Sequence, residues 1–327
     1  MMAENFFDLG KVGAIDLLME SGSFKKGVTG NQASVLLMEG TDFDLTYFPL
    51  KHLGYKAVVL ATAELYSRMA HPEDLSVRLG VSSKLDFPQI KELWDGMVSA
   101  AKEHGYKGAD LDLKPSRNGL TISVCASGNI KTLTEKRRPK AKSKDLIVVS
   151  GPLGASYLGQ QILEKENKKF SEKSSPVDQN ALEKYKMIIG DYLKPEISPS
   201  TVSRLEDEEL YPSFGYVVSN GLSDAVKRLV RDSGLGAKIY VDRLPFEGNS
   251  FDAGKVLDID PVSAAMNGGE DCQILFTIPI LLAEKFRREF QTFDVIGHLA
   301  QSEVGAVLVT PDGVELPLRA QGWKEED

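Results

Sequence analysis

Residues 267–279, NGGEDCQILFTIP, join two glycines and two carboxylates to an apolar run. Gly268-Gly269 allow a positive φ or a close approach of a ligand to the backbone. Glu270-Asp271 follow at the mouth of the strand expected over 274–276, where carboxylates can hold a cation or accept hydrogen bonds from a ligand. Alone, these residues favour a polar turn that enters a buried strand. A binding site is the alternative, and it depends on what else the chain contains.

Size and composition indicate a globular protein with room for two domains. The chain has 327 residues, of which 42% are hydrophobic and 26% charged, which suffices for two cores of ordinary size. Its net charge of −8 argues against a nucleic-acid-binding protein, which needs a basic surface to meet the phosphate backbone. The net charge does not exclude small phosphate-containing ligands, because local basic or metal sites can bind them.

Cysteine usage and the terminal sequence indicate a cytoplasmic protein with no membrane partner. Cys125 and Cys272 each lie in an apolar, strand-like run, which favours reduced thiols over a disulfide framework or a zinc site. The opening MMAENFFDLG lacks a basic start and a long apolar core, so no signal peptide is expected. The longest apolar run, around 274–283, is interrupted by Pro279 and is too short to span a bilayer.

The first half of the chain predicts an α+β domain over residues 1–140. Hydrophobic periodicity over 30–128 gives the order β-β-α-β-α-β-β, with the second strand at 43–48. The basic run at 131–144, KTLTEKRRPKAKSK, follows this pattern. Such runs are usually solvated, so it is interpreted as a connector between two domains.

Residues 141–327 predict a second, α/β domain. A strand at 145–150 is followed by Gly151-Pro152-Leu153-Gly154 and by a helix that starts near 155. This order favours an anion site, since free N–H groups of a helix's first turn point outward. The spacing is neither that of a P-loop nor that of a dinucleotide fingerprint. The polar residues 164–180 predict a mobile surface excursion.

Several stretches together resemble the thiamine-monophosphate kinase family, within the superfamily that contains aminoimidazole ribonucleotide synthetase. They occur in the family's order and span nearly the whole chain. The stretches are LGYKA (53–57), GLTIS (119–123), DLIVVSGPLG (145–154), LKPE (193–196), SNGLS (219–223), NGGEDCQILF (267–276) and GW (322–323).

The resemblance implies both a fold and an activity. The N-terminal α+β domain would pair its strands with a second subunit to close a β-barrel, with the active cleft between the domains and across a homodimer. The activity would be transfer of the γ-phosphate of ATP to thiamine monophosphate, giving thiamine diphosphate, with Mg²⁺ held by aspartates. Phosphoryl transfer depends on positioning and charge neutralisation, and Mg²⁺ prefers carboxylate oxygens.

The same resemblance assigns candidate site residues. Asp110 is the catalytic candidate. The candidate metal ligands are Asp110, Glu64, Asn31 and Asn220. The candidate nucleotide-binding residues are Arg138, Gly151 and Gly154. The candidate substrate-binding residues are Gly268, Gly269, Glu270, Asp271 and Trp323. Trp323 is either a stacking surface for a thiazole or pyrimidine ring or a C-terminal core anchor.

Several departures from the family's pattern fall on the metal ligands. Its Gly-Asp-Asp reads Gly30-Asn31-Gln32 here, and its helix aspartate is Glu64. Its Gly-Gly-Asp-Thr-Thr keeps Asp110 but loses both hydroxyls, and its Asp-x-Ser-Asp-Gly carries Asn220. A neutral amide can ligate Mg²⁺ but supplies no charge. Three other carboxylates could substitute locally, although a solvated surface position is the favoured interpretation: Asp42, Asp44 and Asp112.

Two functions therefore compete. Motif order and the intact 268–271 stretch favour an ATP- and Mg²⁺-dependent kinase acting on thiamine monophosphate or a similar phosphate ester. Joint loss of charge at several metal positions favours a catalytically silent paralogue that binds a nucleotide, a thiamine-like ligand or a partner protein. The kinase is the leading expectation. A third possibility, another superfamily activity with fewer metals, has no feature in its favour.

Overall fold

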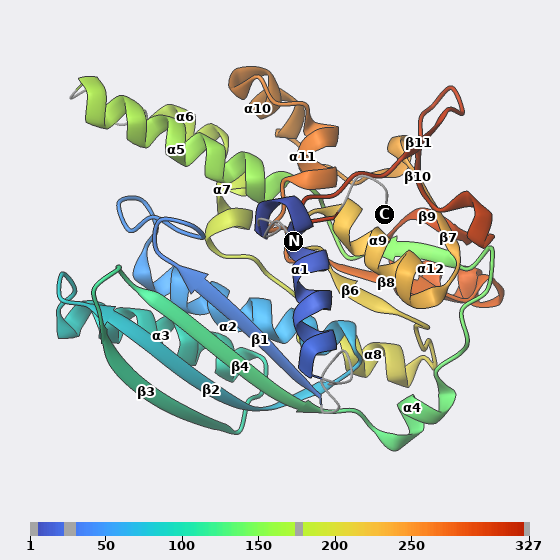
Figure 1. Ribbon diagram of the computed structural model, residues 1–327, viewed down its shortest axis with the longest axis horizontal. Coiled ribbons are helices and arrows are strands. Elements are labelled where there is room, and N and C mark those ends of the chain that lie inside the picture. Colours follow the sequence, from blue (N-terminus) through green and yellow to red (C-terminus); the bar gives the residue numbers. More distant parts are fainter. Residues whose placement is uncertain (1–5, 23–30, 174–178, 324–327) are drawn as a thin grey trace.

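The computed structural model describes residues 6–22, 31–173 and 179–323. Within these residues the strands form a four-stranded sheet, ordered β1-β4-β2-β3, and a seven-stranded sheet, ordered β11-β10-β7-β9-β5-β8-β6. Figure 1 shows the smaller sheet at the lower left and the larger one on the right. None of the described helices is long and apolar enough to span a membrane.

In the described part of the chain, helices cover only one face of the four-stranded sheet. Its elements are β1 (Gln32–Met38), α2 (Leu50–Ser67), β2 (His71–Ser82), α3 (Phe87–Glu103), β3 (Gly108–Ser116) and β4 (Thr121–Asn129). β4 runs antiparallel to both neighbours, and β2 runs parallel to β3. Alternate side chains such as Val77, Ile122 and Val124 are buried against α2 and α3, which lie behind the sheet in Figure 1. The opposite face is open.

The seven-stranded sheet organises the second half. Its strands are β5 (Leu146–Val149), β6 (Gly215–Val217), β7 (Gly236–Tyr240), β8 (Ile274–Ile278), β9 (Asp294–Ala300), β10 (Ala306–Val309) and β11 (Glu315–Pro317). The helices are α4 (Thr132–Arg137), α5 (Ala155–Lys173), α6 (Gln179–Lys184), α7 (Lys186–Leu193), α8 (Thr201–Asp207), α9 (Leu222–Ser233), α10 (Ser250–Leu257), α11 (Pro261–Asn267) and α12 (Ala283–Glu289). Short 3₁₀ turns are η1 (Val241–Arg243), η2 (Ile280–Leu282) and η3 (Ser302–Val304).

Helix α2 is buried on nearly all sides because it lies between the two sheets. It packs against β1 and β4 on one side and against β6 and β8 on the other. Val58, Ala61 and Leu65 are fully buried, and one hydrophobic core runs from the small sheet through α2 to the large sheet. A second core fills the other face of the large sheet, under α9 and α11. A helix with apolar residues on most of its faces belongs in such a position.

The crossing of α2 and α3 depends on two glycines. A Cβ at Gly54 would lie 1.9 Å from the carbonyl oxygen of Leu93. A Cβ at Gly96 would lie 1.9 Å from the carbonyl oxygen of Lys51. The two helix backbones therefore touch at this point, and only residues without a side chain fit there.

Gly54→Ala is expected to lower the free energy of unfolding by about 1–3 kcal/mol, because overpacking forces the helices apart. Gly190→Ala in α7 is the matched control, since its Cβ would meet no atom within 4 Å. That change is expected to be neutral or slightly stabilising. Chemical denaturation measures both. Equal stabilities of the two variants would contradict the close crossing.

The two ends of the described chain meet. Helix α1 (Phe6–Gly22) lies beside the C-terminal segment, and the Val12 N–H donates to the Gly322 carbonyl at 3.0 Å. α1 bends at Gly10, whose φ is +65° and whose Cβ would lie 3.0 Å from the same carbonyl oxygen. Helix α1 is thus attached to the C-terminal segment of the second half.

The strand expected at 43–48 is wrong, because these residues form turns. The carbonyl of Asp44 accepts hydrogen bonds from the N–H groups of Tyr47 and Phe48, and its carboxylate accepts from the Thr46 N–H at 2.8 Å. The turns bring Phe43 and Phe48 together in the core, with ring centroids 6.5 Å apart. Apolar and polar residues alternate from Phe43 to Tyr47, which is the sequence pattern of a strand, although the backbone here is not extended.

The surface excursion expected at 164–180 is in large part helical. α5 continues to Lys173, and the half-exposed Lys169 pairs with the buried carboxylate of Glu166 one turn earlier. Leu158, Ile162 and Leu163 fix its first half in the core. Residues 174–178 lie outside the described part of the chain.

Candidate functional site

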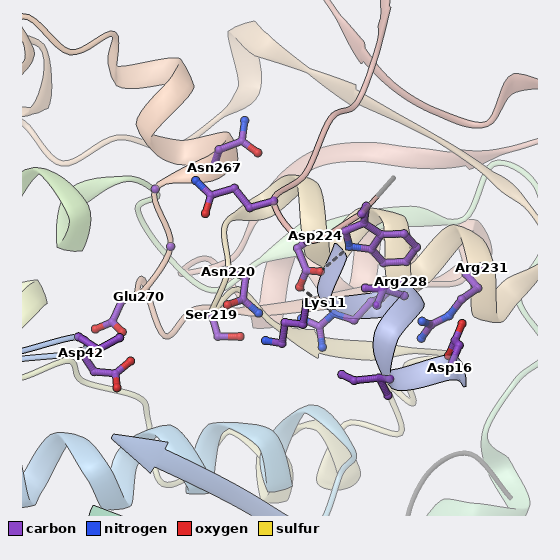
Figure 2. A pocket seen from close by; sticks show the side chains of 18 of the residues that line it. Lys11, Asp16, Asp42, Ser219, Asn220, Asp224, Arg228, Arg231, Asn267 and Glu270 are labelled. Carbon is purple, nitrogen blue, oxygen red and sulfur yellow. Dashed lines mark hydrogen bonds and ion pairs between the residues drawn. The ribbon is translucent and has the colours of Figure 1, made fainter. Parts of the chain in front are cut away.

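A cavity of about 590 Å³ lies where α1, α9, residues 267–270 and residues 321–323 meet. Figure 2 shows Glu270 and Asp42 at one end, Arg231 and Asp16 at the other, and Ser219 and Asn220 between them. Its remaining charged side chains are Lys11, Asp224 and Arg228. Because charges of both signs line it, the cavity suits a polar ligand that carries charge.

The backbone of residues 268–272 is tightly folded at the cavity wall. φ is +82° at Gly269, +66° at Glu270 and +56° at Cys272, values that residues with a side chain rarely adopt. The Glu270 N–H donates to the Ser219 carbonyl at 2.9 Å, which ties the two loops together. Such strain persists only where surrounding contacts enforce it, and it clusters at functional sites.

The glycines expected to permit this folding do so in two different ways. Gly269 takes the positive φ, and its Cβ would lie 2.9 Å from the Ser219 carbonyl oxygen. Gly268 has a φ of −70°, and instead allows close packing, since its Cβ would lie 2.5 Å from the Ala264 carbonyl oxygen. Both residues line the cavity.

The carboxylate of Glu270 is held by a lysine that comes from α2. Lys56 Nζ lies 2.5 Å from Glu270 Oε2 and donates to the Tyr192 carbonyl at 3.0 Å. The same Nζ lies 4.1 Å from the centroid of the Tyr192 ring. Glu270 thus faces the cavity while one of its oxygens is bound to a cation beneath the cavity wall.

Asp271 points away from the cavity and caps α5. Its carboxylate accepts from the Gly154 N–H at 2.8 Å and from the Ser156 N–H at 3.3 Å. Burial raises the pKa of Asp271 to about 8, with further increases from the charges of Asp191 and Glu270 and a partial decrease from the two N–H donors. The chain's own carboxylate therefore binds the helix terminus that the sequence offers to an anion.

The glycine turn before α5 is packed against α11 and against Gln273. A Cβ at Gly154 would lie 2.7 Å from the Ala265 nitrogen, and one at Gly151 would lie 2.9 Å from Gln273 Oε1. Gln273 also accepts from the Ser150 hydroxyl at 2.6 Å. A smaller cavity of about 160 Å³ is lined in part by Ser150 and Gln273. Gly151 and Gly154 therefore allow a close approach of other parts of the chain.

Trp323 lies in the cavity wall and is fixed by α9. Its Nε1–H donates to Asp224 Oδ1 at 2.8 Å, and Asp224 Oδ2 lies 3.0 Å from Arg228 Nε. The cationic groups of Lys227 and Arg231 lie 5.1 and 5.5 Å from the indole ring. Because Trp323 is half-buried and lines the cavity, its position fits a stacking surface.

Sequence reasoning missed the contribution of α9. Positions 224, 228 and 231 follow helical spacing, so one face of α9 presents Asp224, Arg228 and Arg231 to the cavity. That spacing was available in the sequence. The contributions of Lys11 and Asp16 in α1 had no comparable signal, because they depend on the docking of α1 against the C-terminal segment.

The candidate metal ligands do not all meet at one site. Asp110 lies on the open face of β3, with 68% of its side chain exposed, and pairs with Arg78 at 2.6 Å. Glu64 lies in α2 and pairs with Arg68 at 3.6 Å. The carbonyl of Asn31 accepts from the Gly128 N–H at 2.8 Å. Asn220 alone of the four lines the cavity.

Arg138 and Glu64 come together around Arg68. Arg138 Nη2 donates to the Arg68 carbonyl at 2.8 Å, and Arg68 Nη1 donates to the Gln32 carbonyl at 2.7 Å. The structure therefore gathers Arg138, Glu64 and the 31–32 segment into one region. Asn220 lies with the cavity, and Asp110 contacts neither group.

The described side chains do not fit a magnesium cluster built by the protein. Across residues 6–22, 31–173 and 179–323, no three His, Cys, Asp or Glu side chains gather where they could hold a metal ion. Of the local substitutes, Asp42 lines the cavity, and burial raises its pKa. Asp44 stabilises the turn at 43–48, and Asp112 lies exposed on β3.

Comparison with known proteins identifies relatives along the whole chain. No protein-family model matches. The thiamine-monophosphate kinase of Aquifex aeolicus is 24% identical, over 97% of this chain and 98% of the relative. The thiamine-monophosphate kinase of Bacillus subtilis is also 24% identical, over 88% of this chain and 85% of the relative.

Solved structures show the same fold. The crystal structure of thiamine monophosphate kinase from Aquifex aeolicus has a TM-score of 0.78 at 22% identity, covering 96% of this chain and all of that one. A structure of AaThiL complexed with AMPPCP and TMP has a TM-score of 0.79 at 21% identity, covering 99% and 100%. The hydrogenase maturation protein HypE has a TM-score of 0.64 at 17% identity, covering 95% and 98%. Along nearly its whole length the sequence is similar to thiamine-monophosphate kinases, and the chain has their fold.

Proposed function

We propose that the protein transfers the γ-phosphoryl group of ATP to thiamine monophosphate. The bond between the β,γ-bridging oxygen and the γ-phosphorus breaks, and a phosphate oxygen of the acceptor bonds to that phosphorus, giving ADP and thiamine diphosphate. One observation carries the proposal: residues 267–270 and 322–323, from two of the stretches that carry the family resemblance, line one cavity of about 590 Å³. The complex of the related fold with AMPPCP, a nucleoside triphosphate analogue, and TMP supports this ligand pair.

The cavity suits the acceptor. Thiamine monophosphate combines a cationic thiazolium ring, an aminopyrimidine and a phosphate. Trp323 offers an aromatic face, and the carboxylates of Glu270 and Asp42 offer negative charge and hydrogen-bond acceptors. Gly268 and Gly269 let the ligand approach the wall closely. Asp271 would act indirectly, by fixing the segment that carries Glu270.

We place the nucleotide beside the acceptor, with Arg138, Gly151 and Gly154 as its candidate binding residues and Glu64 as a candidate metal ligand near Arg138. The described side chains offer Mg²⁺ no ready-made cluster. Magnesium would therefore arrive bound to the phosphates of ATP, as it commonly does, retaining several waters. Asn31, Asn220 and Asp110 remain our proposed metal ligands. Asp110 would take this role only within a dimer, because in one chain it lies apart from the cavity.

The dimer proposal rests on the open face of the four-stranded sheet. Leu36 and Met38 of β1 are exposed on that face. β3 is an edge strand, exposed along nearly its whole length. A long uncovered edge is an aggregation liability unless another strand covers it. We therefore propose that two chains pair here to close a β-barrel, with domains 1–140 and 141–327 in each chain, and that the homodimer is cytoplasmic.

Leu36→Asp is expected to convert the dimer to monomers, because it places a charge on the face that the partner would cover. Light scattering coupled to size exclusion measures the mass. Leu281→Asp is the control, since Leu281 is the more exposed side chain, at 93%, and lies in η2 of the other half. A wild-type protein that has the mass of one chain would contradict the proposed pairing.

The activity test uses the purified full chain with ATP, thiamine monophosphate and excess Mg²⁺. We expect formation of ADP and thiamine diphosphate in equal amounts, and no ADP without the acceptor. Asp110→Ala should abolish turnover, whereas Asp112→Ala, at an exposed position on the same strand, should retain it. Saturable binding of thiamine monophosphate without turnover would overturn the kinase assignment and identify a binding protein.

A further inference from the structure

Lys56 is a cation enclosed within the protein. Its residue is 1% exposed, and its Nζ contacts Glu270 Oε2 and the Tyr192 carbonyl. The rings of Tyr192 and Phe48 lie 4.1 and 5.5 Å from the same Nζ. A lysine is almost never fully buried unless its charge is paired, and aromatic faces add attraction to a desolvated cation. Among the described side chains that contact Nζ, Glu270 is the one that carries a charge.

Glu270 depends on this partner for its orientation. Its backbone is held at a φ of +66°, and 27% of its side chain is exposed toward the cavity. The carboxylate of Asp42 lies close enough for each negative charge to disfavour the other. Without a cation beneath it, the Glu270 side chain would turn toward solvent, where its charge is better hydrated.

The position of Lys56 in α2 makes the contact rigid. α2 is packed between both sheets, so Lys56 cannot follow movements of the 267–272 segment. Tyr192, which supplies the carbonyl and the ring, is itself fully buried in α7 and contacts Phe48, with centroids 5.2 Å apart. Groups locked by packing on rigid elements hold functional side chains more accurately than loops do.

We propose that Lys56 is a positioning residue that holds the Glu270 carboxylate in the cavity wall for a cationic or amino-bearing heterocycle. This deepens the proposed function, on which its kinetic consequences rest. The structural consequence does not rest on the proposed function, because the ion pair should order residues 267–273 whatever the protein catalyses.

Hydrogen exchange tests the structural consequence. Lys56→Met keeps the length and removes the charge, so backbone exchange over 267–273 is expected to quicken by about tenfold, roughly the loss of one charge-assisted hydrogen bond. Lys91→Met is the matched control, since Lys91 forms a solvent-exposed ion pair with Asp95, at 2.6 Å, on the surface of α3. Glu270→Gln removes the pair from its other side and should quicken exchange in the same segment. Unchanged exchange in both Lys56→Met and Glu270→Gln would overturn the proposal.

Kinetics test the positioning role. Lys56→Met is expected to raise KM for thiamine monophosphate by about tenfold while KM for ATP stays unchanged. Lys56→Arg, which restores the charge, should recover part of the loss. The double variant Lys56→Met/Glu270→Gln should have a KM no higher than that of the more impaired single variant, because both changes remove the same interaction. Additive losses would show that Lys56 acts independently of Glu270.

Failure of the proposed function and failure of the positioning role give different results. If the wild-type protein neither binds nor phosphorylates thiamine monophosphate, the proposed function fails, and the exchange experiment still decides whether Lys56 orders the 267–273 segment. If turnover is normal in Lys56→Met and exchange is unchanged, the proposed function stands and the positioning role fails. Thermal melting of each variant shows whether it is folded. Removing one partner of a buried ion pair is destabilising, whereas the double variant Lys56→Met/Glu270→Gln leaves no unpaired charge and keeps the comparison possible.

Discussion

Asp271→Ala is expected to lower the free energy of unfolding by about 3–4 kcal/mol. The carboxylate of Asp271 is buried, and it accepts the N–H groups of Gly154 and Ser156 at the start of α5. Alanine would leave both donors buried without a partner, and each such group costs about 1–3 kcal/mol. Urea denaturation at neutral pH measures the loss.

An exposed cap provides the comparison. Asp260 caps α11 by accepting the Ser263 N–H at 2.9 Å, in an exposed position. Loss of such a cap typically costs about 1 kcal/mol, so Asp260→Ala is expected to be much milder. Asp271→Asn should fall between the two, because the amide oxygen replaces one acceptor but its NH₂ group cannot replace the other. A cost for Asp271→Ala equal to that for Asp260→Ala would refute the buried cap.

The same residue gives stability a pH dependence of definite sign. Burial raises the pKa of Asp271 from 3.8 to about 8 in the folded protein. The folded state therefore keeps a proton that the unfolded state loses, and stability falls as pH rises from about 4 to about 8. The slope is at most about 1.4 kcal/mol per pH unit. Asp271→Asn lacks this term, so the stability advantage of the wild type over it should shrink with rising pH. A constant difference between pH 5 and 8 would contradict the shift.

The paired carboxylates show how far the sequence could predict the site. The motif placed Glu270 and Asp271 at the mouth of a strand, and β8 does begin at Ile274. The different directions of the two side chains could not be predicted, since they follow from positive φ values at Glu270 and Cys272. Those values are imposed by contacts with residues 219–220 and with α5, which are distant in sequence.

Lys56 illustrates the same limit. The LGYKA stretch carries part of the family resemblance, but nothing in it indicates that its lysine is enclosed. That burial arises because α2 lies between two sheets, one of which is built from residues that come almost a hundred positions later or more. Hydrophobic periodicity predicted the helices that flank the site, including α2, because each needs only its own local pattern. The charges of the cavity come from α1, α9 and the two loops that carry Asp42 and Glu270, and no local pattern encodes how these segments dock.

The candidate metal residues show a third limit. A family pattern indicates which side chains matter but not whether one chain brings them together. Asp110 and Asn220 belong to the same pattern, yet Asp110 pairs with Arg78 on the open sheet while Asn220 lines the cavity. If a second subunit completes the site, its contribution is invisible in the sequence of one chain.

Trp323→Ala is expected to raise KM for thiamine monophosphate by about 10–100-fold and to leave KM for ATP unchanged. Stacking of a heterocycle on an aromatic side chain is worth about 1–3 kcal/mol, and 1.4 kcal/mol corresponds to a factor of ten. Trp323→Phe keeps an aromatic face but loses the hydrogen bond to Asp224, so a smaller increase is expected. Steady-state kinetics with each substrate varied in turn measure both effects.

A binding measurement separates stacking from a purely structural role. The chain has two tryptophans, and Trp94→Phe leaves Trp323 as the sole indole, so its emission should change saturably as thiamine monophosphate is added. An anchor without contact to the ligand would give no such change, and Trp323→Ala would then lower the melting temperature while leaving KM unaltered. The tether to Asp224 favours the first outcome. Asp224 already binds the indole Nε1–H and pairs with Arg228 beneath the cavity, which leaves the ring in the wall as a fixed surface rather than as filling for a core.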